Sequence, residues 1–270
     1  MMMLGFPEKN EKAWMPWVMT RLIALVVFAQ SVFAQGGSAG TGGRIEPRFI
    51  VDMPTAGILA KGSLAVDADF YADGGMLLGS SIGVFDRLSL GISFGGTGLI
   101  GSDPVVMNQV PGFSIRVRPL EESLALPALL VGFDSQGKGF YDKVRSRYQT
   151  KSPGFFAVLS KNFLLLGYLS LHGGTNYSLE NADGNGGMNF YFGAEKTLGP
   201  FLSVIGEYNA GLNDSNINAS GKGRGFLNVA LNISLGGGLT IGFNFKDLLE
   251  NERNTSGVSR TVHLEYVRDL

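Results

Sequence analysis

Apolar and polar side chains alternate along most of the chain after residue 60. The clearest example is residues 227–245, where every second residue from Leu227 to Leu235 is apolar, three glycines follow, and the alternation resumes from Leu239 to Phe245. This period of two with a glycine turn between the halves predicts a β-hairpin with one apolar face. The apolar face needs an apolar neighbour, which is a second sheet in a soluble sandwich and lipid in a membrane barrel.

Alternation of this kind recurs along the chain and predicts about twelve strands. Most of the segments are seven to eleven residues long, which is typical of transmembrane β-strands, and an even number suits a closed antiparallel barrel. The predicted strands are 62–70, 75–84, 87–95, 112–118, 125–133, 154–161, 163–172, 187–196, 201–208, 225–235, 238–246 and 260–267. The segment 163–171, FLLLGYLSL, is apolar on both faces and does not fit this pattern.

The connections between these segments alternate in length. After the first hairpin, the short links are 85–86, 119–124, 162, 197–200 and 236–237, and the long polar ones are 96–111, 134–153, 173–186, 209–224 and 247–259. Short turns on one rim and long loops on the other are the pattern of outer-membrane barrels. A sandwich with Greek-key crossovers gives no reason for this sorting. We therefore predict an all-β fold, a closed antiparallel transmembrane β-barrel of about 12 strands in the bacterial outer membrane, with outer-membrane lipid around it.

The polar face of the strands predicts which residues line the lumen. In residues 112–118, Phe113, Ile115 and Val117 alternate with Ser114, Arg116 and Arg118. Applied to the other strands, the same parity predicts the following lumen-lining residues: Asp67, Asp69, Arg116, Arg118, Asn189, Glu195, Asn244, Lys246, His263 and Glu265.

The first 43 residues read as a targeting segment and a linker. Three basic residues precede the apolar run 22–28, and Val32-Phe33-Ala34 follows it, which predicts a signal peptide over 1–34 with cleavage after Ala34. The alternative is an N-terminal membrane anchor, but the run is much shorter than the roughly 20 apolar residues that span a bilayer. Residues 35–43 are rich in Gly and Ser and predict a linker, and residues 44–270 are assigned to the barrel.

Composition removes several classes of function. The chain has no cysteine, which excludes disulfides, a Cys-ligated metal and a thiol nucleophile. Its formal net charge is −1 without a long run of one sign, so we expect no nucleic-acid partner. The stretch 96–101 matches G-x-G-x-x-G, but Pro104 and Pro111 stand where the phosphate-binding helix has to begin. His172 and His263 are the only histidines and have no recognisable nucleophile arrangement. We expect no metal, no cofactor and no enzymatic activity.

Two phrases in the chain are similar to a known family. VDMPTAGILAKGSL, Val51 to Leu64, resembles the opening of the YjbH-type exopolysaccharide-biosynthesis outer-membrane β-barrels, in which such a phrase leads through a glycine into the first strand. Residues 126–163 resemble a segment of the same family, in which a Pro-Ala-Leu strand, a glycine-rich loop and a strand closing on Ser-Lys follow one another. The resemblance implies a passive part in the secretion of envelope polysaccharide.

Three functions remain open on the sequence. The first is a non-enzymatic outer-membrane barrel for polysaccharide secretion or narrow solute passage. The second is a structural or adhesive barrel that binds a partner through its external loops, and the third is a secreted soluble β-sandwich that binds carbohydrate. The segment 134–153 is locally basic, so we expect an external-loop contact with polysaccharide or lipopolysaccharide phosphate through Lys138, Lys143, Arg145, Arg147 and Lys151.

Overall fold

A computed structural model describes residues 46–253, 255 and 257–270. The predicted signal peptide over 1–34 and the linker over 35–43 lie outside these residues. The described part contains fifteen strands: β1 (Ser63–Tyr71), β2 (Gly75–Phe85), β3 (Leu88–Thr97), β4 (Val106–Met107), β5 (Gly112–Leu120), β6 (Ala128–Asp134), β7 (Lys138–Asp142), β8 (Arg147–Thr150), β9 (Gly154–Leu164), β10 (Tyr168–Tyr177), β11 (Met188–Thr197), β12 (Leu202–Asn209), β13 (Phe226–Gly236), β14 (Leu239–Lys246) and β15 (Ser259–Asp269). Across the described ranges, no helix is long and apolar enough to cross a membrane.

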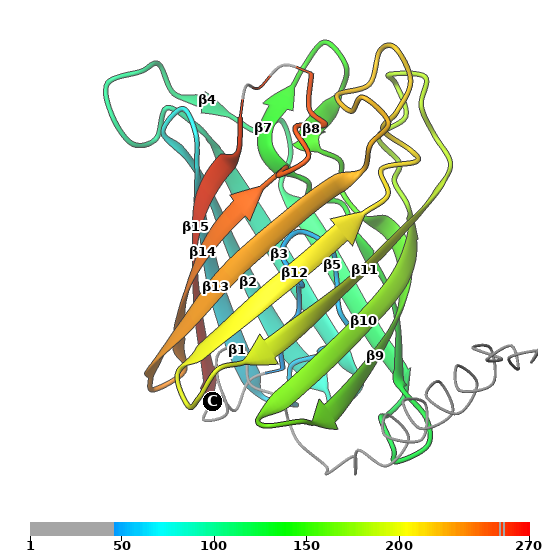
Figure 1. Ribbon diagram of the computed structural model, residues 1–270. Helices are drawn as coiled ribbons and strands as arrows, with labels where there is room; N and C mark the ends of the chain where they lie inside the picture. Colours follow the sequence, from blue (N-terminus) through cyan, green and yellow to red (C-terminus); the bar gives the residue numbers. More distant parts are fainter. Residues whose placement is uncertain (1–45, 254, 256) are drawn as a thin grey trace, which may run out of the picture.

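Twelve of these strands form one closed antiparallel barrel (Figure 1). Each pairs with its neighbours along the chain, β1 pairs with β15, and β2 pairs with both β1 and β3, so the wall returns to its starting strand. The short β4 pairs only with the end of β3, and β7 and β8 form a separate hairpin. The predicted all-β closed barrel of about twelve strands is confirmed.

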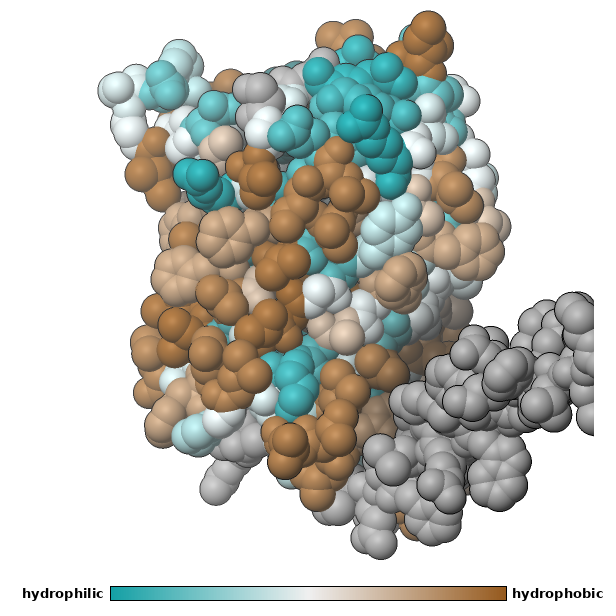
Figure 2. All heavy atoms as spheres, viewed as in Figure 1, coloured by the Kyte–Doolittle hydropathy of each residue, from teal (hydrophilic) through white to brown (hydrophobic). Residues whose placement is uncertain are grey.

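The wall is apolar outside and polar inside. On β11, Phe190 and Phe192 are exposed while Asn189, Tyr191 and Glu195 between and beyond them are buried. Apolar side chains cover the wall over most of its height, and hydrophilic ones gather over the loops (Figure 2). Closed barrels satisfy all backbone hydrogen bonds between strands, which hydrocarbon requires, and this architecture is that of outer-membrane proteins. The surface therefore agrees with the predicted location in the bacterial outer membrane.

The connections are sorted by length, as predicted. Antiparallel alternation places 72–74, 98–111, 135–153, 178–187, 210–225 and 247–258 on one rim, which we call the outer rim. The links 86–87, 121–127, 165–167, 198–201 and 237–238 lie on the opposite rim, which we call the inner rim. Which rim faces the outside of the cell stays a prediction.

One predicted strand boundary is wrong. The predicted link at Asn162 lies within β9, and the chain turns at residues 165–167. Leu166 and Gly167 have positive φ angles of 46° and 99°, and the Leu165 N–H donates to the Gly167 carbonyl at 2.7 Å. The segment 163–171 is apolar on both faces because its middle is this turn, where Leu165 and Leu166 are exposed at the inner rim.

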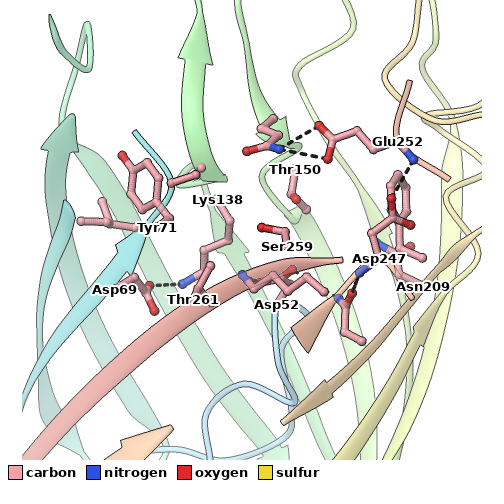
Figure 3. Close-up of a pocket in the computed structure, with 17 residues that line it drawn as sticks. Asp52, Asp69, Tyr71, Lys138, Thr150, Asn209, Asp247, Glu252, Ser259 and Thr261 are labelled. Carbon is pink, nitrogen blue, oxygen red and sulfur yellow. Dashed lines mark hydrogen bonds and ion pairs between the residues drawn. The ribbon is translucent and has the colours of Figure 1, made fainter. Parts of the chain in front are cut away.

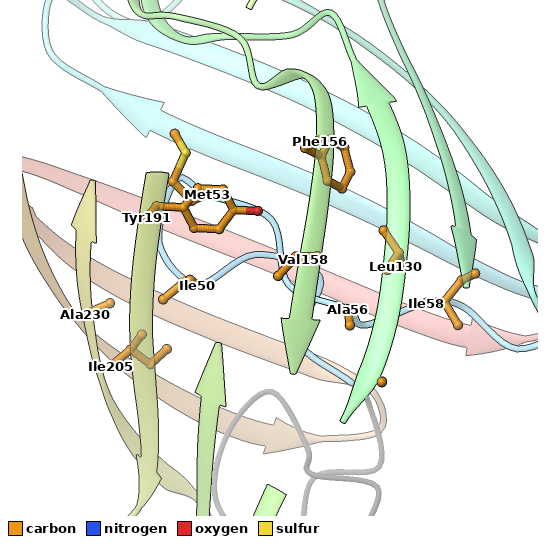
Figure 4. Close-up of a cluster of buried hydrophobic side chains, with 11 residues drawn as sticks. Ile50, Met53, Ala56, Ile58, Leu130, Phe156, Val158, Tyr191, Ile205 and Ala230 are labelled. Atoms are coloured by element: carbon orange, nitrogen blue, oxygen red, sulfur yellow. The ribbon is translucent and has the colours of Figure 1, made fainter. Parts of the chain in front are cut away.

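Residues 46–59, which precede the first strand of the wall, lie inside the barrel. We call these residues the strap. Ile50, Met53, Ala56 and Ile58 of the strap pack against inward side chains of the wall (Figure 4). This placement could not be predicted from the sequence, because a segment with Pro47 and Pro54 and mixed polarity has neither a strand nor a helix period.

The apolar outer surface of the wall predicts that the cost of an outward-facing arginine on β14 depends on its depth in the bilayer. Phe243 lies in the middle of the strand and Leu239 at its inner-rim end, on the same outward face. Phe243→Arg is expected to lower the free energy of unfolding in lipid vesicles by about 2–4 kcal/mol, and Leu239→Arg by about 0–1 kcal/mol, because an arginine near the interface reaches water. Urea titration of both variants measures the difference. Equal losses at the two depths would contradict a bilayer around the barrel.

Candidate functional site: the strap and the lumen

A carboxylate of the wall binds the backbone of the strap at its turn. Glu207 on β12 is 1% exposed, and its Oε2 accepts the backbone N–H groups of Val51, Asp52 and Met53 at 2.9, 2.9 and 2.8 Å. The other carboxylate oxygen accepts from the Asn228 side chain at 2.8 Å. Consecutive N–H groups that converge in this way form a nest for an anion. The turn of the strap is therefore shaped around Glu207.

Charged pairs hold the two sides of the strap. The Arg48 guanidinium donates to Asp67 on β1 and to Glu265 on β15, the latter at 2.8 Å. Arg116 on β5, three strands from β1 along the wall, donates to the Arg48 carbonyl at 2.8 Å. Pairs of this kind are stable in a poorly hydrated interior only when each charge is matched. The strap supplies the partners of these wall charges.

Two further ion pairs join the strap to the wall. Asp52 accepts from the Lys246 ammonium of β14 at 2.5 Å. Glu46, nearer the inner rim, is paired with Arg118 of β5. Ion pairs thus bind the first half of the strap, from Glu46 to Asp52, to the wall.

An apolar cluster complements the ion pairs. Ile50 and Met53 lie against Tyr191 and Ile205, and Ala56 and Ile58 lie toward Leu130 and Val158 (Figure 4). Burying one such large side chain contributes about 1.5–3 kcal/mol. The strap therefore fills the lumen on the inner-rim side with both apolar and charged contacts.

A polar chamber lies between the strap and the outer loops. Its two connected parts share Asp69, Leu77 and Lys138 among their lining residues. In the part drawn in Figure 3, the Lys138 ammonium donates to Asp69 at 2.6 Å, and Asp52 of the strap lies on the far side from Glu252 and Thr150. Four carboxylates and two lysines line this part: Asp52, Asp69, Asp247, Glu252, Lys138 and Lys246. This part of the chamber therefore carries more acidic than basic side chains.

Four of the outer-rim connections are joined into one unit, which we call the cap: 135–153, 178–187, 210–225 and 247–258. Arg147 is 1% exposed and donates to Asp183 at 2.8 Å and to Asp214 at 2.6 and 2.8 Å. Lys151 donates to Asp183 at 2.9 Å. Burial alone would raise the pKa of Asp183, but its bonds with Lys151 and Arg147 lower it below its usual value. The cap is thus held by a buried cluster of two basic and two acidic side chains.

A further contact joins the last of these connections. The Gln149 side-chain amide donates to both oxygens of Glu252 at 2.8 and 2.9 Å. Gly221 and Glu252 also form an isolated β-bridge between two of the loops. The cap therefore covers the chamber as one connected layer.

The ten residues predicted to line the lumen have their side chains on the inner face of the wall. Six of them contact the strap or each other through ion pairs: Asp67, Asp69, Arg118, Lys246, His263 and Glu265. Arg116 binds strap carbonyls, Asn189 bonds to Asn176 and Asn209, and Asn244 bonds to Thr261. Glu195 is buried on the same face as Asn189. Strand parity missed Glu207, although it lies on an inward position of the predicted strand 201–208. Asp134 was assigned to the predicted connection 134–153, whereas it is the last residue of β6.

Of the five basic residues predicted to contact an external anion, three point into the barrel or its loops and two are exposed. Lys138 points into the chamber, and Arg147 and Lys151 are buried in the cap cluster. These three are therefore inaccessible to a polysaccharide or to lipopolysaccharide phosphate, because acidic residues distant in sequence already surround them. Arg145 is exposed and pairs with Asp142 at 2.8 Å, and Lys143 is exposed at the tip of the hairpin. An anion contact at these two residues stays a prediction.

The structure also brings one serine and one histidine together. Ser160 Oγ and His172 Nδ1 are hydrogen-bonded at 2.8 Å, and the same Ser160 oxygen accepts the Ala56 N–H of the strap at 2.9 Å. Ser160 and His172 lie next to the strap, and the bond from Ala56 to Ser160 helps to hold the strap against β9. Within the described ranges, no group of three or more His, Cys, Asp or Glu residues is arranged to hold a metal ion.

Comparisons with known proteins yield structural neighbours of low similarity. No protein-family model matches the chain, and no curated protein matches its sequence. Among solved structures, it is similar to the KdgM porin, with 12% identity, a TM-score of 0.44, and coverage of 76% of this chain and 98% of that one. It is also similar to the NanC porin, with 6% identity, a TM-score of 0.42, and coverage of 77% of this chain and 99% of that one. A third similar structure is the Acinetobacter baumannii outer membrane protein Omp33, with 7% identity, a TM-score of 0.40, and coverage of 77% of this chain and 97% of that one. At these values, the architecture rests on the strand pairing of this chain itself.

Proposed function

We propose that the chain is a non-enzymatic outer-membrane β-barrel that lets small solutes pass through a narrow polar lumen, and that the strap gates this passage. One observation carries the proposal: the wall closes through β1 and β15 without any contribution from the strap. The strap can therefore leave the lumen without breaking a strand pair. Its release exposes Glu207, Asp67, Glu265 and Arg116, which water hydrates readily, so the vacated space is suited to aqueous solutes.

The charge of the chamber indicates which solutes pass more easily. Across both of its parts, six carboxylates line the chamber against two lysines and two arginines, with His263 beside them. In a narrow lumen, charged rings favour counterions and oppose ions of their own sign. We therefore expect the open barrel to prefer cations and neutral solutes to anions.

Swelling of proteoliposomes tests the passage. A variant lacking residues 46–58 is compared with the intact chain in external arabinose, glucose and raffinose. We expect the truncated barrel to admit arabinose at least about tenfold faster than the intact one, and to exclude raffinose, because a barrel of about twelve strands lies between filled and wide barrels. Heat-modifiable migration on a gel establishes that both barrels are folded. A folded truncated barrel that excludes arabinose would overturn solute passage and leave a structural or adhesive barrel.

The finer proposal is that the solute is envelope polysaccharide in export. It is supported by the resemblance of residues 51–64 to the YjbH-type barrels, since this phrase overlaps the strap from Val51 to Leu59. A strain lacking the gene is complemented with the intact chain or with the variant lacking residues 46–58, and extracellular polysaccharide is measured. Reduced polysaccharide in the deletion strain that the intact gene restores is the expected result. Unchanged polysaccharide would contradict this finer proposal without affecting the passage of small solutes.

A further inference from the structure

A groove on the outer rim lies outside the lumen and outside the chamber. It runs between the connection 98–111, which we call the flap, and the hairpin that begins with β7 (β4 and β7 in Figure 1). Its lining residues are Asp73, Thr97, Val106, Met107, Asn108, Phe140 and Tyr141. The flap is fixed to the β1–β2 turn, because the Gly98 N–H donates to the Asp73 carbonyl and the Leu99 N–H to the Gly74 carbonyl, both at 2.9 Å. The groove is therefore built from anchored segments.

One wall of the groove holds a largely buried asparagine whose side-chain amide bonds to no described group. Asn108 is 6% exposed, and its backbone N–H donates to the Gly95 carbonyl at 2.9 Å. Among the described residues, no group forms a hydrogen bond with its side-chain amide, which supplies two donor hydrogens and an acceptor. The amide is therefore free to bond to water or to a ligand in the groove. The Asp73 carboxylate and the Thr97 hydroxyl lie along the same groove and add one acceptor and one group that both donates and accepts.

The opposite wall is aromatic. Phe140 and Tyr141 are half-buried, and the Tyr141 ring is held edge-on against Tyr148, with ring centroids 5.0 Å apart and an interplanar angle of 74°. Val106 and Met107 add an apolar border from the flap. Among the described residues that line the groove, Asp73 is charged and none is a lysine, arginine or histidine. Its ligand is therefore uncharged or cationic, with a flat apolar face and several hydroxyl-like groups at its edge.

We propose that this groove binds a neutral hexopyranose unit of a glycan. One face of a pyranose ring presents C–H groups, which pack on aromatic rings such as Phe140 and Tyr141. Its hydroxyls both donate and accept, which matches Asn108, Asp73 and Thr97. The groove is separate from the chamber, so this contact is a second function of the barrel and does not depend on passage through the lumen.

The test uses the full barrel in a detergent without a sugar headgroup. Saturation-transfer difference NMR is recorded with methyl α-glucoside, methyl α-galactoside, methyl α-mannoside and cellobiose as probes. We expect transfer to at least one probe, and at least about a fivefold weaker affinity in Asn108→Leu, which removes the amide. Asp73→Asn is the second variant, and it is expected to weaken binding several-fold. Residue 73 has a φ angle of 58°, which asparagine tolerates as aspartate does, so folding is preserved. Val144→Ala, at the exposed tip of the same hairpin, is the control and is expected to bind as the unchanged chain does.

Two results would overturn the proposal. One is the absence of transfer to all four probes from the folded barrel. The other is transfer that both Asn108→Leu and Asp73→Asn leave unchanged, since the sugar then binds elsewhere. Neither result bears on proteoliposome swelling, so the two proposals fail independently.

Discussion

Replacing Arg147 by methionine is expected to open the cap. The substitution leaves Asp183 and Asp214 buried without their shared guanidinium, and it also removes donors to the carbonyls of Tyr148 and Gln149. Breaking a buried ion pair by removing one partner costs about 3–5 kcal/mol. Since the strand wall does not depend on this cluster, we expect the barrel to stay folded while the outer loops become open to proteolysis.

Proteinase K digestion of barrels in vesicles measures this effect. Cleavage within 135–153 and 178–187 is expected to accelerate at least about a hundredfold in Arg147→Met, because each 1.4 kcal/mol corresponds to a factor of ten. Arg145→Met, two residues earlier, is the matched control. Arg145 is exposed and pairs only with Asp142 of the same turn, so its loss costs about 0–1 kcal/mol. Equal cleavage of the two variants would contradict a cap held by the buried cluster.

Glu207→Leu is expected to release the strap. The leucine fills a similar volume, but the N–H groups of Val51, Asp52 and Met53 lose their common acceptor and stay buried. Each hydrogen bond to a charged group contributes about 1.5–3 kcal/mol, and the three contributions are not additive. Hydrogen exchange of the peptide that contains residues 46–59 is expected to accelerate at least about a hundredfold, with the wall strands unchanged.

The control for this experiment is Glu195→Leu. Glu195 is a buried acid on the neighbouring strand β11 and has the same inward orientation, but no strap atom bonds to it among the described contacts. We expect exchange of the strap in this variant to match that of the unchanged chain. If both variants accelerate exchange to the same degree, the strap responds to the lumen charge in general and not to the amide nest around Glu207.

The strands of the wall could be predicted from the sequence because the side chains of each strand alternate between the lipid outside and the polar interior. Phe190 and Phe192 alternate with Asn189 and Tyr191 along β11, and this period appears in any barrel whose outside is lipid and whose inside is polar. The boundary between β9 and β10 was misplaced because a turn containing Leu165 and Leu166 retains the hydrophobicity of a strand. Local patterns therefore predict the strands better than their ends.

The contents of the lumen could not be predicted in this way. The strap is bound by residues far from it in sequence: Arg48 and Glu265 are 217 positions apart, and Val51 and Glu207 are 156 apart. Arg147 and Lys151 were predicted to be external cations because the acids that neutralise them, Asp183 and Asp214, belong to other loops. Strand parity identified wall residues such as Arg116 and Asp67 as inward-facing, but it has no information about what occupies the space they face.

Movement of the strap is the central claim, and a reversible tether tests it most directly. The chain has no cysteine, so Ala56→Cys with Ser160→Cys introduces a single pair, at positions where the Ala56 N–H lies 2.9 Å from Ser160 Oγ. Single-channel current is recorded from this variant in a planar bilayer before and after oxidation. We expect brief openings in the reduced state, their loss when the disulfide forms, and their return on reduction. Openings that continue unchanged after complete oxidation would contradict the strap as the gate.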